Sequence, residues 1–276
     1  MMPSTISLVM INTNMSTFDI NCDMGEWESE AEAERQQLSP SSAESDLALM
    51  PFISSCSIAC GGHIGDEHSM RTTVRNALQN GLRVGAHPAY PDKGNFGRLS
   101  LDLPLADLTA ALFSQISTLR GIVAQEGGQL AFVKPHGALY NDMVKNAALA
   151  DKVIDTIKRI DPSLPLMGLA GSDLDKRCAA RNVSFIAEAF ADRRYSDNGE
   201  LTSRNIPGSV IEDPQAAADQ ILSLIKQESV TAITGKVIAL KANTLCVHSD
   251  TRGALNHVKA INTLLQEHNV EVGVAK

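Results

Sequence analysis

Four histidines and several acidic residues of this sequence each lie directly after a short apolar run. They belong to a wider set of polar residues placed in the same way: Asp23, Glu26, His63, Asp66, His87, Lys134, His136, Asp192, Arg193, His248 and Asp250. Carboxylates and imidazoles gathered in one place suit two kinds of chemistry. They can hold a divalent cation that lowers the pKa of a bound water. They can also act without metal, with a carboxylate orienting a histidine that serves as a general base. The long separations along the chain leave both open.

Other polar residues in this set have a structural alternative beside the functional one. Lys134 can bind a carboxylate or phosphate, or pair with a neighbouring acid. Arg98 and Arg193 carry the planar fork that suits a substrate carboxylate, and the same fork serves surface ion pairs. Asp66 can act in a site or cap the helix that is predicted to begin near Glu67.

The local sequence around His63 predicts a strand, a tight turn and a helix. The apolar and β-branched run 52–59 is typical of a buried strand. Gly61 and Gly62 end it, Gly65 allows a sharp turn, and Asp66 stands where a helix cap is expected. His63 therefore follows the carboxyl end of a strand, where parallel α/β folds place their chemistry.

The same strand-and-helix pattern recurs along the chain. Strands are predicted at 18–23, 52–59, 82–86, 129–133, 164–169, 184–189 and 244–247, with 270–274 expected to close the sheet. Helices are predicted over 67–80, 105–125, 147–160, from the loop at 171–172 to about 180, 214–226 and 254–268. This alternation indicates one domain with a parallel sheet, and seven or eight units favour a barrel whose strand ends share one mouth.

Two polar segments interrupt the alternation. Residues 28–45 are rich in Glu, Ser and Gln and are expected to form a solvated loop or surface helix. The long segment 88–100, which contains Gly97 and Arg98, fits a binding loop better than a plain connection.

Composition narrows the function classes further. The 276-residue chain has a net charge of −8 and no Lys/Arg cluster, which argues against nucleic acid or an anionic membrane as partner. Five scattered cysteines indicate reduced thiols in the cytoplasm. Three of them, Cys22, Cys60 and Cys246, lie near strand ends, where a thiol nucleophile is an alternative to a buried strand residue. The chain contains neither a dinucleotide-binding glycine motif nor an ATP-binding P-loop.

Seven sequence blocks closely resemble the LamB/YcsF family, in order from about residue 18 to the C-terminus. They are DINCDMGE at 19–26, ACGGHIGD at 59–66, GAHP at 85–88, FGR at 96–98, VKPHGALYN at 133–141, FADR at 190–193 and VHSD at 247–250. The resemblance implies a single-domain, seven-stranded, TIM-like (β/α) barrel over residues 18–276, related to the glycoside hydrolase and deacetylase fold. Residues 1–17 would form a loose extension.

The resemblance also implies an activity. The family is the A subunit of the ATP-dependent 5-oxoprolinase, a hydrolase of a cyclic amide that opens 5-oxo-L-proline, or a related lactam, to L-glutamate. It acts with partner subunits B and C, through which ATP is expected to enter the reaction.

Residue roles follow from the matched blocks. The catalytic residues implied are Asp23, Glu26, His63, His87 and His136, and the substrate-binding residues are Asp66, Arg98, Lys134, Tyr140, Asp192, Arg193 and His248. If a divalent metal is bound, Asp23, His63 and His87 would be its ligands. Two rival functions stand beside this one: a metal-dependent deacetylase or amidohydrolase acting alone, and a scaffold that presents the lactam without chemistry.

The chain departs from the family pattern at two of these positions. Gly62 stands where the family usually has an aromatic residue, and Ser249 where it usually has glycine. The first change is expected to widen the pocket.

Overall fold

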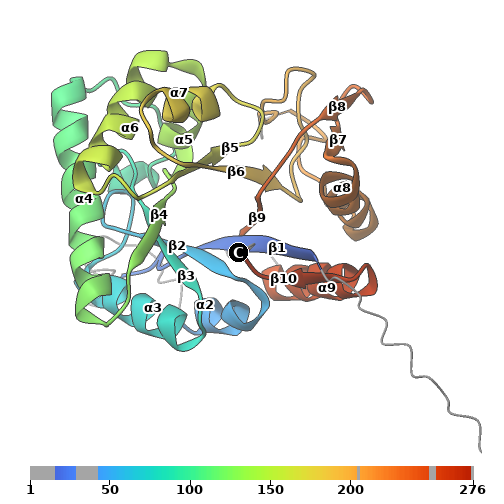
Figure 1. The fold of residues 1–276 in the computed structure, drawn as a ribbon, viewed down its shortest axis with the longest axis horizontal. Helices are drawn as coiled ribbons and strands as arrows, with labels where there is room; N and C mark the ends of the chain where they lie inside the picture. The colour runs from blue at the N-terminus through green and yellow to red at the C-terminus, as the bar shows by residue number, and fades with distance from the viewer. Residues whose placement is uncertain (1–15, 29–42, 204–205, 249–252, 275–276) are drawn as a thin grey trace, which may run out of the picture.

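Seven parallel strands close into a barrel (Figure 1). The computed structural model describes residues 16–28, 43–203, 206–248 and 253–274. The barrel strands are β1 (Ser16–Met24), β2 (Ser55–Ala59), β3 (Arg83–His87), β4 (Leu130–Val133), β5 (Leu166–Leu169), β6 (Phe185–Phe190) and β9 (Thr244–His248). Each pairs in parallel with the next, and β9 closes the ring by pairing with both β6 and β1. The predicted seven-stranded barrel is confirmed.

Helices surround the barrel on its outer side (Figure 1). They are α2 (Ala43–Leu49), α3 (Glu67–Gln79), α4 (Leu105–Gln125), α5 (Gly137–Lys145), α6 (Ala147–Ile160), α7 (Leu174–Ala180), α8 (Pro214–Gln227) and α9 (Ala254–Glu267). Short 3-10 turns lie at Met50–Phe52 and Lys93–Asn95. The predicted helices are confirmed to within a few residues at their ends. No helix in the described part of the chain is long and apolar enough to cross a membrane.

The structure adds one helix and one hairpin of two strands that the sequence analysis missed. Helix α5 starts at Gly137, directly after the end of β4. The glycine has a positive φ of 54°, and no side chain caps the helix, so the usual start signals are absent. Strands β7 (Ser229–Thr231) and β8 (Val237–Ala239) form an antiparallel hairpin too short to show a periodic pattern.

The expectation that 270–274 closes the sheet is wrong. Strand β10 (Val270–Val272) pairs only with the first residues of β1, Ser16 to Phe18. Further along β1, the neighbour is β9. The barrel is therefore closed by β9, and not by β10 as expected.

The expected N-terminal extension, residues 1–17, lies outside the described residues except for Ser16 and Thr17, which begin β1. Most of the predicted surface segment 28–45 also lies outside them, and its last residues begin α2.

The apolar core lies between the outer face of the barrel and the helices. Successive strand residues point to opposite faces. In β1, Ile20, Cys22 and Met24 join a buried apolar cluster that includes Leu112 and Ile116 of α4. The alternate positions are polar, and the Asn21 side chain donates to the side chain of Thr244 on the neighbouring strand β9. The barrel interior is consequently polar near its carboxyl end.

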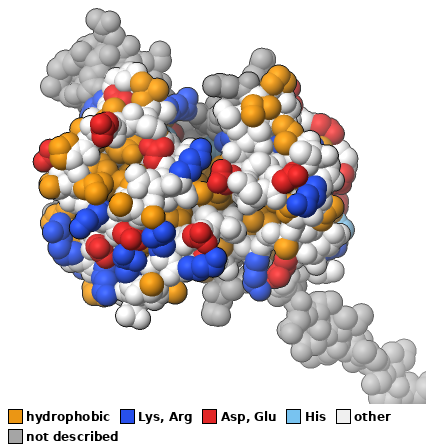
Figure 2. Space-filling view, turned by 90° about the horizontal axis from the view of Figure 1, so that it is seen from above, with side chains coloured by type: hydrophobic (Ala, Val, Ile, Leu, Met, Phe, Trp, Pro, Cys, Tyr) orange, Lys and Arg blue, Asp and Glu red, His pale blue; other side chains and the backbone are white. Residues whose placement is uncertain are grey.

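Charged side chains of both signs are interspersed on the face shown in Figure 2. That face carries no broad single-sign patch, in keeping with the absence of a Lys/Arg cluster from the sequence.

Gly85 of β3 leaves room for the fully buried ring of Phe132 on β4, because a Cβ at Gly85 would lie 2.2 Å from the ring. We therefore expect Gly85→Ala to lower the free energy of unfolding by about 1–3 kcal/mol, the usual range for overpacking. Chemical denaturation measures this. Gly121→Ala in α4 is the matched control, since nothing lies within 4 Å of its added Cβ; it should be neutral or stabilising. Equal stability of the two variants would contradict the prediction.

Candidate functional site

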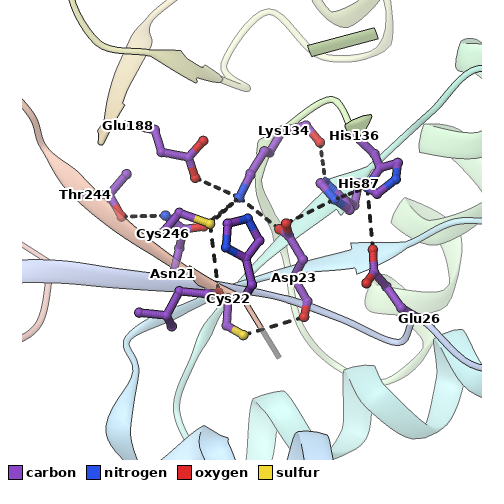
Figure 3. Close-up of polar contacts among 12 residues, drawn as sticks. Asn21, Cys22, Asp23, Glu26, His87, Lys134, His136, Glu188, Thr244 and Cys246 are labelled. Atoms are coloured by element: carbon purple, nitrogen blue, oxygen red, sulfur yellow. Dashed lines mark hydrogen bonds and ion pairs between the residues drawn. The ribbon is translucent and has the colours of Figure 1, made fainter. Parts of the chain in front are cut away.

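A buried lysine, Lys134, lies at the centre of the site, directly after β4, and its partners come from β1, β6 and β9 (Figure 3). The Nζ atom of Lys134 lies 2.9 Å from Oδ1 of Asp23 and 2.7 Å from Oε1 of Glu188. It donates to Oδ1 of Asn21 at 3.0 Å and to Sγ of Cys246 at 3.2 Å. Burial opposes the charge, but the neighbouring anions, Asp23 foremost, hold the pKa of Lys134 well above its usual value. The ammonium is therefore permanently charged.

The same surroundings shift the pKa of the Asp23 carboxyl. Burial would raise the pKa of its carboxyl, but the contacts with His87 and with the ammonium of Lys134 outweigh burial and hold that pKa well below its usual range. Asp23 is consequently a carboxylate at neutral pH.

Backbone carbonyls fix the tautomers of two histidines. Nδ1 of His87 donates to the carbonyl of Lys134 at 2.7 Å, and Nε2 of His136 donates to the carbonyl of Phe96 at 3.0 Å. A carbonyl only accepts, so these two nitrogens carry the protons. In the neutral tautomers that these bonds select, the remaining nitrogens, Nε2 of His87 and Nδ1 of His136, carry the lone pairs, and they face each other at 3.0 Å.

Two carboxylates lie beside these two nitrogens. Oδ2 of Asp23 is 3.4 Å from Nε2 of His87, and Oε1 of Glu26 is 3.5 Å from Nδ1 of His136. Glu26 also accepts from Nε2 of His63 at 3.0 Å. In this part of the described structure, carboxylate and imidazole acceptors therefore converge on the space between the two rings.

His63 lies behind this group and is fully buried. Its ring stacks on that of His136, with centroids 3.7 Å apart and planes within 5°. The ring of His87 stands almost perpendicular to that of His136, at 84°. Burial and then the neighbouring imidazoles lower the pKa of His136 to about 2 and that of His63 well below its usual value, so both rings are neutral at neutral pH.

The predicted binding loop covers the stacked histidines. Phe96 has a left-handed backbone with φ of 53°, which is strained for a bulky residue. Its ring lies edge-on to those of His63 and His136, at 5.1 and 5.4 Å. At Gly97, a Cβ would come within 2.9 Å of Cβ of His63. The strained conformation therefore lets this loop lie closely over the rings and present the Phe96 carbonyl to His136.

A cavity of about 440 Å³ opens onto this group from the barrel mouth. The predicted site residues that line it are Asp23, Glu26, His87, Arg98, Lys134, His136, Tyr140, Arg193 and His248. Asp192 is not among the lining residues but lies 3.3 Å from His248, and the His248 ring stacks on Phe190. Asp250 lies outside the described residues.

Besides Asp192, two predicted site residues lie away from the cavity lining. His63 is behind it, against Glu26. Asp66 is the N-cap of α3, where its side chain accepts from the backbone N–H of Ser69 at 2.8 Å. The observed geometry of Asp66 is thus that of a helix cap, the structural alternative to a role in the site.

Among the described residues, two groups could each hold a metal ion: Glu26 with His63, His87 and His136, and Asp23 with Cys246 and His248. The predicted ligand set of Asp23, His63 and His87 is divided between these two groups.

The thiol alternative receives no support. Burial raises the pKa of Cys22, Cys60 and Cys246 above the usual value, so each is a neutral thiol at neutral pH rather than a thiolate nucleophile.

The sequence analysis missed Glu188 and Phe96. Glu188 is fully buried within β6, and an acid inside the otherwise apolar run 185–190 was the signal available for it. Phe96 contributes through its carbonyl, and no side-chain pattern reveals that.

The expectation that Gly62 widens the pocket is wrong. A Cβ at Gly62 would lie 2.3 Å from the side chain of Gln115, which occupies that space. Gln115 is held there by two hydrogen bonds to the backbone of Ala89, at 2.9 and 3.0 Å.

Comparison with known proteins gives a consistent relationship. The model of the LamB/YcsF family matches residues 18–276. The A subunit of 5-oxoprolinase from Bacillus cereus (strain AH187) is 36% identical over 95% of this chain and 100% of the relative. The corresponding protein from Acinetobacter baumannii (strain ACICU) is 41% identical over 82% of this chain and 89% of the relative. The crystal structure of the lactam utilization protein from Thermus thermophilus is 33% identical, covers 94% of this chain and 100% of its own, and superposes with a TM-score of 0.85.

The pair of His248 and Asp192 generates a pH-dependent prediction. Burial lowers the pKa of His248, but the hydrogen bond to Asp192 outweighs burial and leaves it above the usual value. A raised pKa in the folded state stabilises the fold below about pH 6.5, and this contribution is lost as pH rises through the folded pKa. We expect Asp192→Asn to lower the pKa of His248 in an NMR titration. The difference in unfolding free energy between the two proteins should shrink as pH rises; a difference independent of pH would contradict the assignment.

Proposed function

The chain belongs to the LamB/YcsF family, and we propose that it is the A subunit of a 5-oxoprolinase that opens 5-oxo-L-proline, or a closely related lactam, to L-glutamate. The relatives that carry this name support the proposal over most of their length and of this chain. The observation that carries it is the cavity at the barrel mouth, where Asp23, Glu26, His87 and His136 meet the charged Lys134.

The proposed chemistry is attack of water on the lactam carbonyl. The oxygen of water bonds to the carbonyl carbon, the ring C–N bond breaks, and the nitrogen leaves as an amine after taking up a proton. The carboxylate of Asp23, which lies 3.4 Å from Nε2 of His87 at the cavity, can take the proton of the attacking water. The ammonium of Lys134 supplies positive charge toward the oxygen that becomes negative in the transition state.

The carboxylate of 5-oxoproline requires a positively charged side chain other than Lys134. Arg98 and Arg193 both line the cavity. Arg193 is largely buried, and its guanidinium donates to the carbonyl of Thr202 at 2.7 Å, which fixes its orientation. A fixed guanidinium is suited to bidentate recognition of a carboxylate.

ATP enters this proposal through partner subunits B and C. A lactam is stabilised by resonance, so its opening is coupled to ATP, yet the sequence has no P-loop to cradle phosphates. The partners would therefore handle ATP, and this chain would handle the lactam. We place the reaction in the cytoplasm, since all five cysteines are free.

A divalent cation is part of the same proposal. The support for it is the convergence of imidazole and carboxylate acceptors from His87, His136 and Glu26. Such a cation would lower the pKa of a bound water and polarise the lactam carbonyl.

The division between subunits gives a direct prediction. The purified chain alone should hydrolyse no ATP, with or without 5-oxoproline, because it lacks a phosphate-binding loop. Together with its partner subunits it should form glutamate and incorporate one oxygen atom from ¹⁸O-labelled water, detected by mass spectrometry. Lactam-stimulated ATP hydrolysis by the single chain would reject the division. A complete complex that forms no glutamate from 5-oxoproline would reject the function.

The substrate-binding assignment is tested at Arg193. Arg193→Lys keeps the charge but loses the fork, so we expect KM for 5-oxoproline in the complete complex to rise about 10-fold to 100-fold while kcat changes little. Arg194→Lys is the matched control, because the neighbouring Arg194 does not line the cavity. An unchanged KM in Arg193→Lys, or an equal rise in both variants, would contradict the assignment.

A further inference from the structure

We propose that the cation is a divalent transition metal held by His87, His136 and Glu26, and that His63 is not a ligand but orients Glu26. The catalytic role of this ion rests on the proposed function. Its binding can be measured on this chain alone.

The first support is the direction of the lone pairs. Both Nδ1 of His87 and Nε2 of His136 are committed as donors to backbone carbonyls. The two remaining nitrogens therefore meet lone pair to lone pair at 3.0 Å, with a carboxylate oxygen of Glu26 nearby. Metal-bound histidines commonly donate the other ring N–H to a carbonyl or carboxylate. A cation between these acceptors turns their mutual repulsion into attraction.

The second support is spacing. Two ligands that lie about 2.0–2.1 Å from a tetrahedral zinc ion are roughly 3.3 Å apart. The nitrogens of His87 and His136 are 3.0 Å apart, and the nitrogen of His136 is 3.5 Å from Oε1 of Glu26. These two separations are thus close to those that one ion would impose, and all the ligand atoms of the group lie within 4.8 Å of one another. Two histidines and a glutamate are also a known protein set for catalytic zinc.

The third support excludes His63 from the ligand set. An ion bound by an imidazole nitrogen lies near the plane of its ring, along the lone pair. The rings of His63 and His136 are stacked with planes within 5° and centroids 3.7 Å apart, so no single point lies in both planes. The nearly perpendicular rings of His87 and His136 can share one ion. His63 instead donates to Glu26 and so fixes the direction of that carboxylate.

The cavity agrees with this division of roles. His87, His136 and Glu26 line it, whereas His63 does not. Three protein ligands leave one position of a tetrahedral ion open toward the cavity for water or substrate. Asp23 lies beside His87 at 3.4 Å and can accept a proton from water bound there.

The donor set also limits which cation is expected. Imidazole together with carboxylate suits Zn²⁺ and neighbouring transition metals, whereas Mg²⁺ prefers an all-oxygen, mostly hydrated shell. Co²⁺ is the probe of choice, because its visible absorption reports ligand type and geometry.

The experiment uses the full-length chain, stripped with a chelator and titrated with Co²⁺ in the absence of lactam, ATP and partner subunits. The wild-type chain should bind one Co²⁺ per chain, with Zn²⁺ displacing it and excess Mg²⁺ leaving it in place. Glu26→Gln, which preserves side-chain size, should weaken Co²⁺ binding by at least about tenfold and alter the spectrum. His136→Ala should do the same, and circular dichroism establishes that each variant is folded.

The variants of His63 separate orientation from ligation. His63→Gln keeps an N–H donor for Glu26 and should retain the wild-type spectrum. His63→Leu removes the donor and should weaken binding about 10-fold to 100-fold, with the wild-type spectrum restored at saturating Co²⁺. The exposed His257 on α9 provides the control, His257→Gln, which should bind as the wild type does.

Several results would overturn the proposal. A folded wild-type chain that binds neither Co²⁺ nor Zn²⁺ would leave a shared proton, not a metal, between His87 and His136. A spectrum altered in His63→Gln as strongly as in Glu26→Gln would make His63 a ligand. An equal loss of binding in His257→Gln would place the ion elsewhere. None of these measurements involves turnover, so a failed 5-oxoprolinase assay and a failed metal titration are separate results.

Discussion

The charged ammonium of Lys134 is the constraint on which the rest of the site depends. A buried charge is tolerated only when it is paired and hydrogen-bonded, and Asp23 and Glu188 provide that pairing from β1 and β6. The same residue acts through its main chain, because its carbonyl fixes the proton on Nδ1 of His87. One strand end therefore sets the charge at the barrel mouth and the orientation of a histidine nitrogen toward the cavity.

This arrangement requires a barrel with a polar interior. A strand can meet that requirement because its two faces are independent: in β1, Cys22 and Met24 contact the apolar layer, while Asn21 and Asp23 face inward. Stability then comes mainly from packing between barrel and helices, with Leu112 and Ile116 of α4 in the fully buried part. The interior is left available for charged groups and a cavity.

The sequence predicts the barrel and the gathering of polar residues because both follow from local patterns. Helices 105–125 and 147–160 are visible as periodic apolar runs between clear breakers. Residues that end parallel strands must meet at one mouth, so the convergence of Asp23, His87 and His136 can be foreseen without any knowledge of side-chain positions. Their roles in a reaction stay predictions.

The features that the sequence does not predict depend on tertiary contacts. The tautomer of His136 depends on a carbonyl 40 residues away in the chain, and the space beside Gly62 depends on a glutamine from α4. Neither residue type nor spacing carries this information, since each contact is created when distant segments meet.

The hydrogen bond from Nε2 of His136 to the carbonyl of the strained Phe96 connects the loop over the histidines to any ligand bound at Nδ1 of the same ring. A ligand that draws on the Nδ1 lone pair makes the Nε2 proton more acidic and strengthens its bond to the Phe96 carbonyl. Thermodynamic linkage is reciprocal, so a loop that holds this conformation more firmly also raises the affinity at Nδ1. The loop over the site and the occupant of the cavity are in this way two ends of one equilibrium.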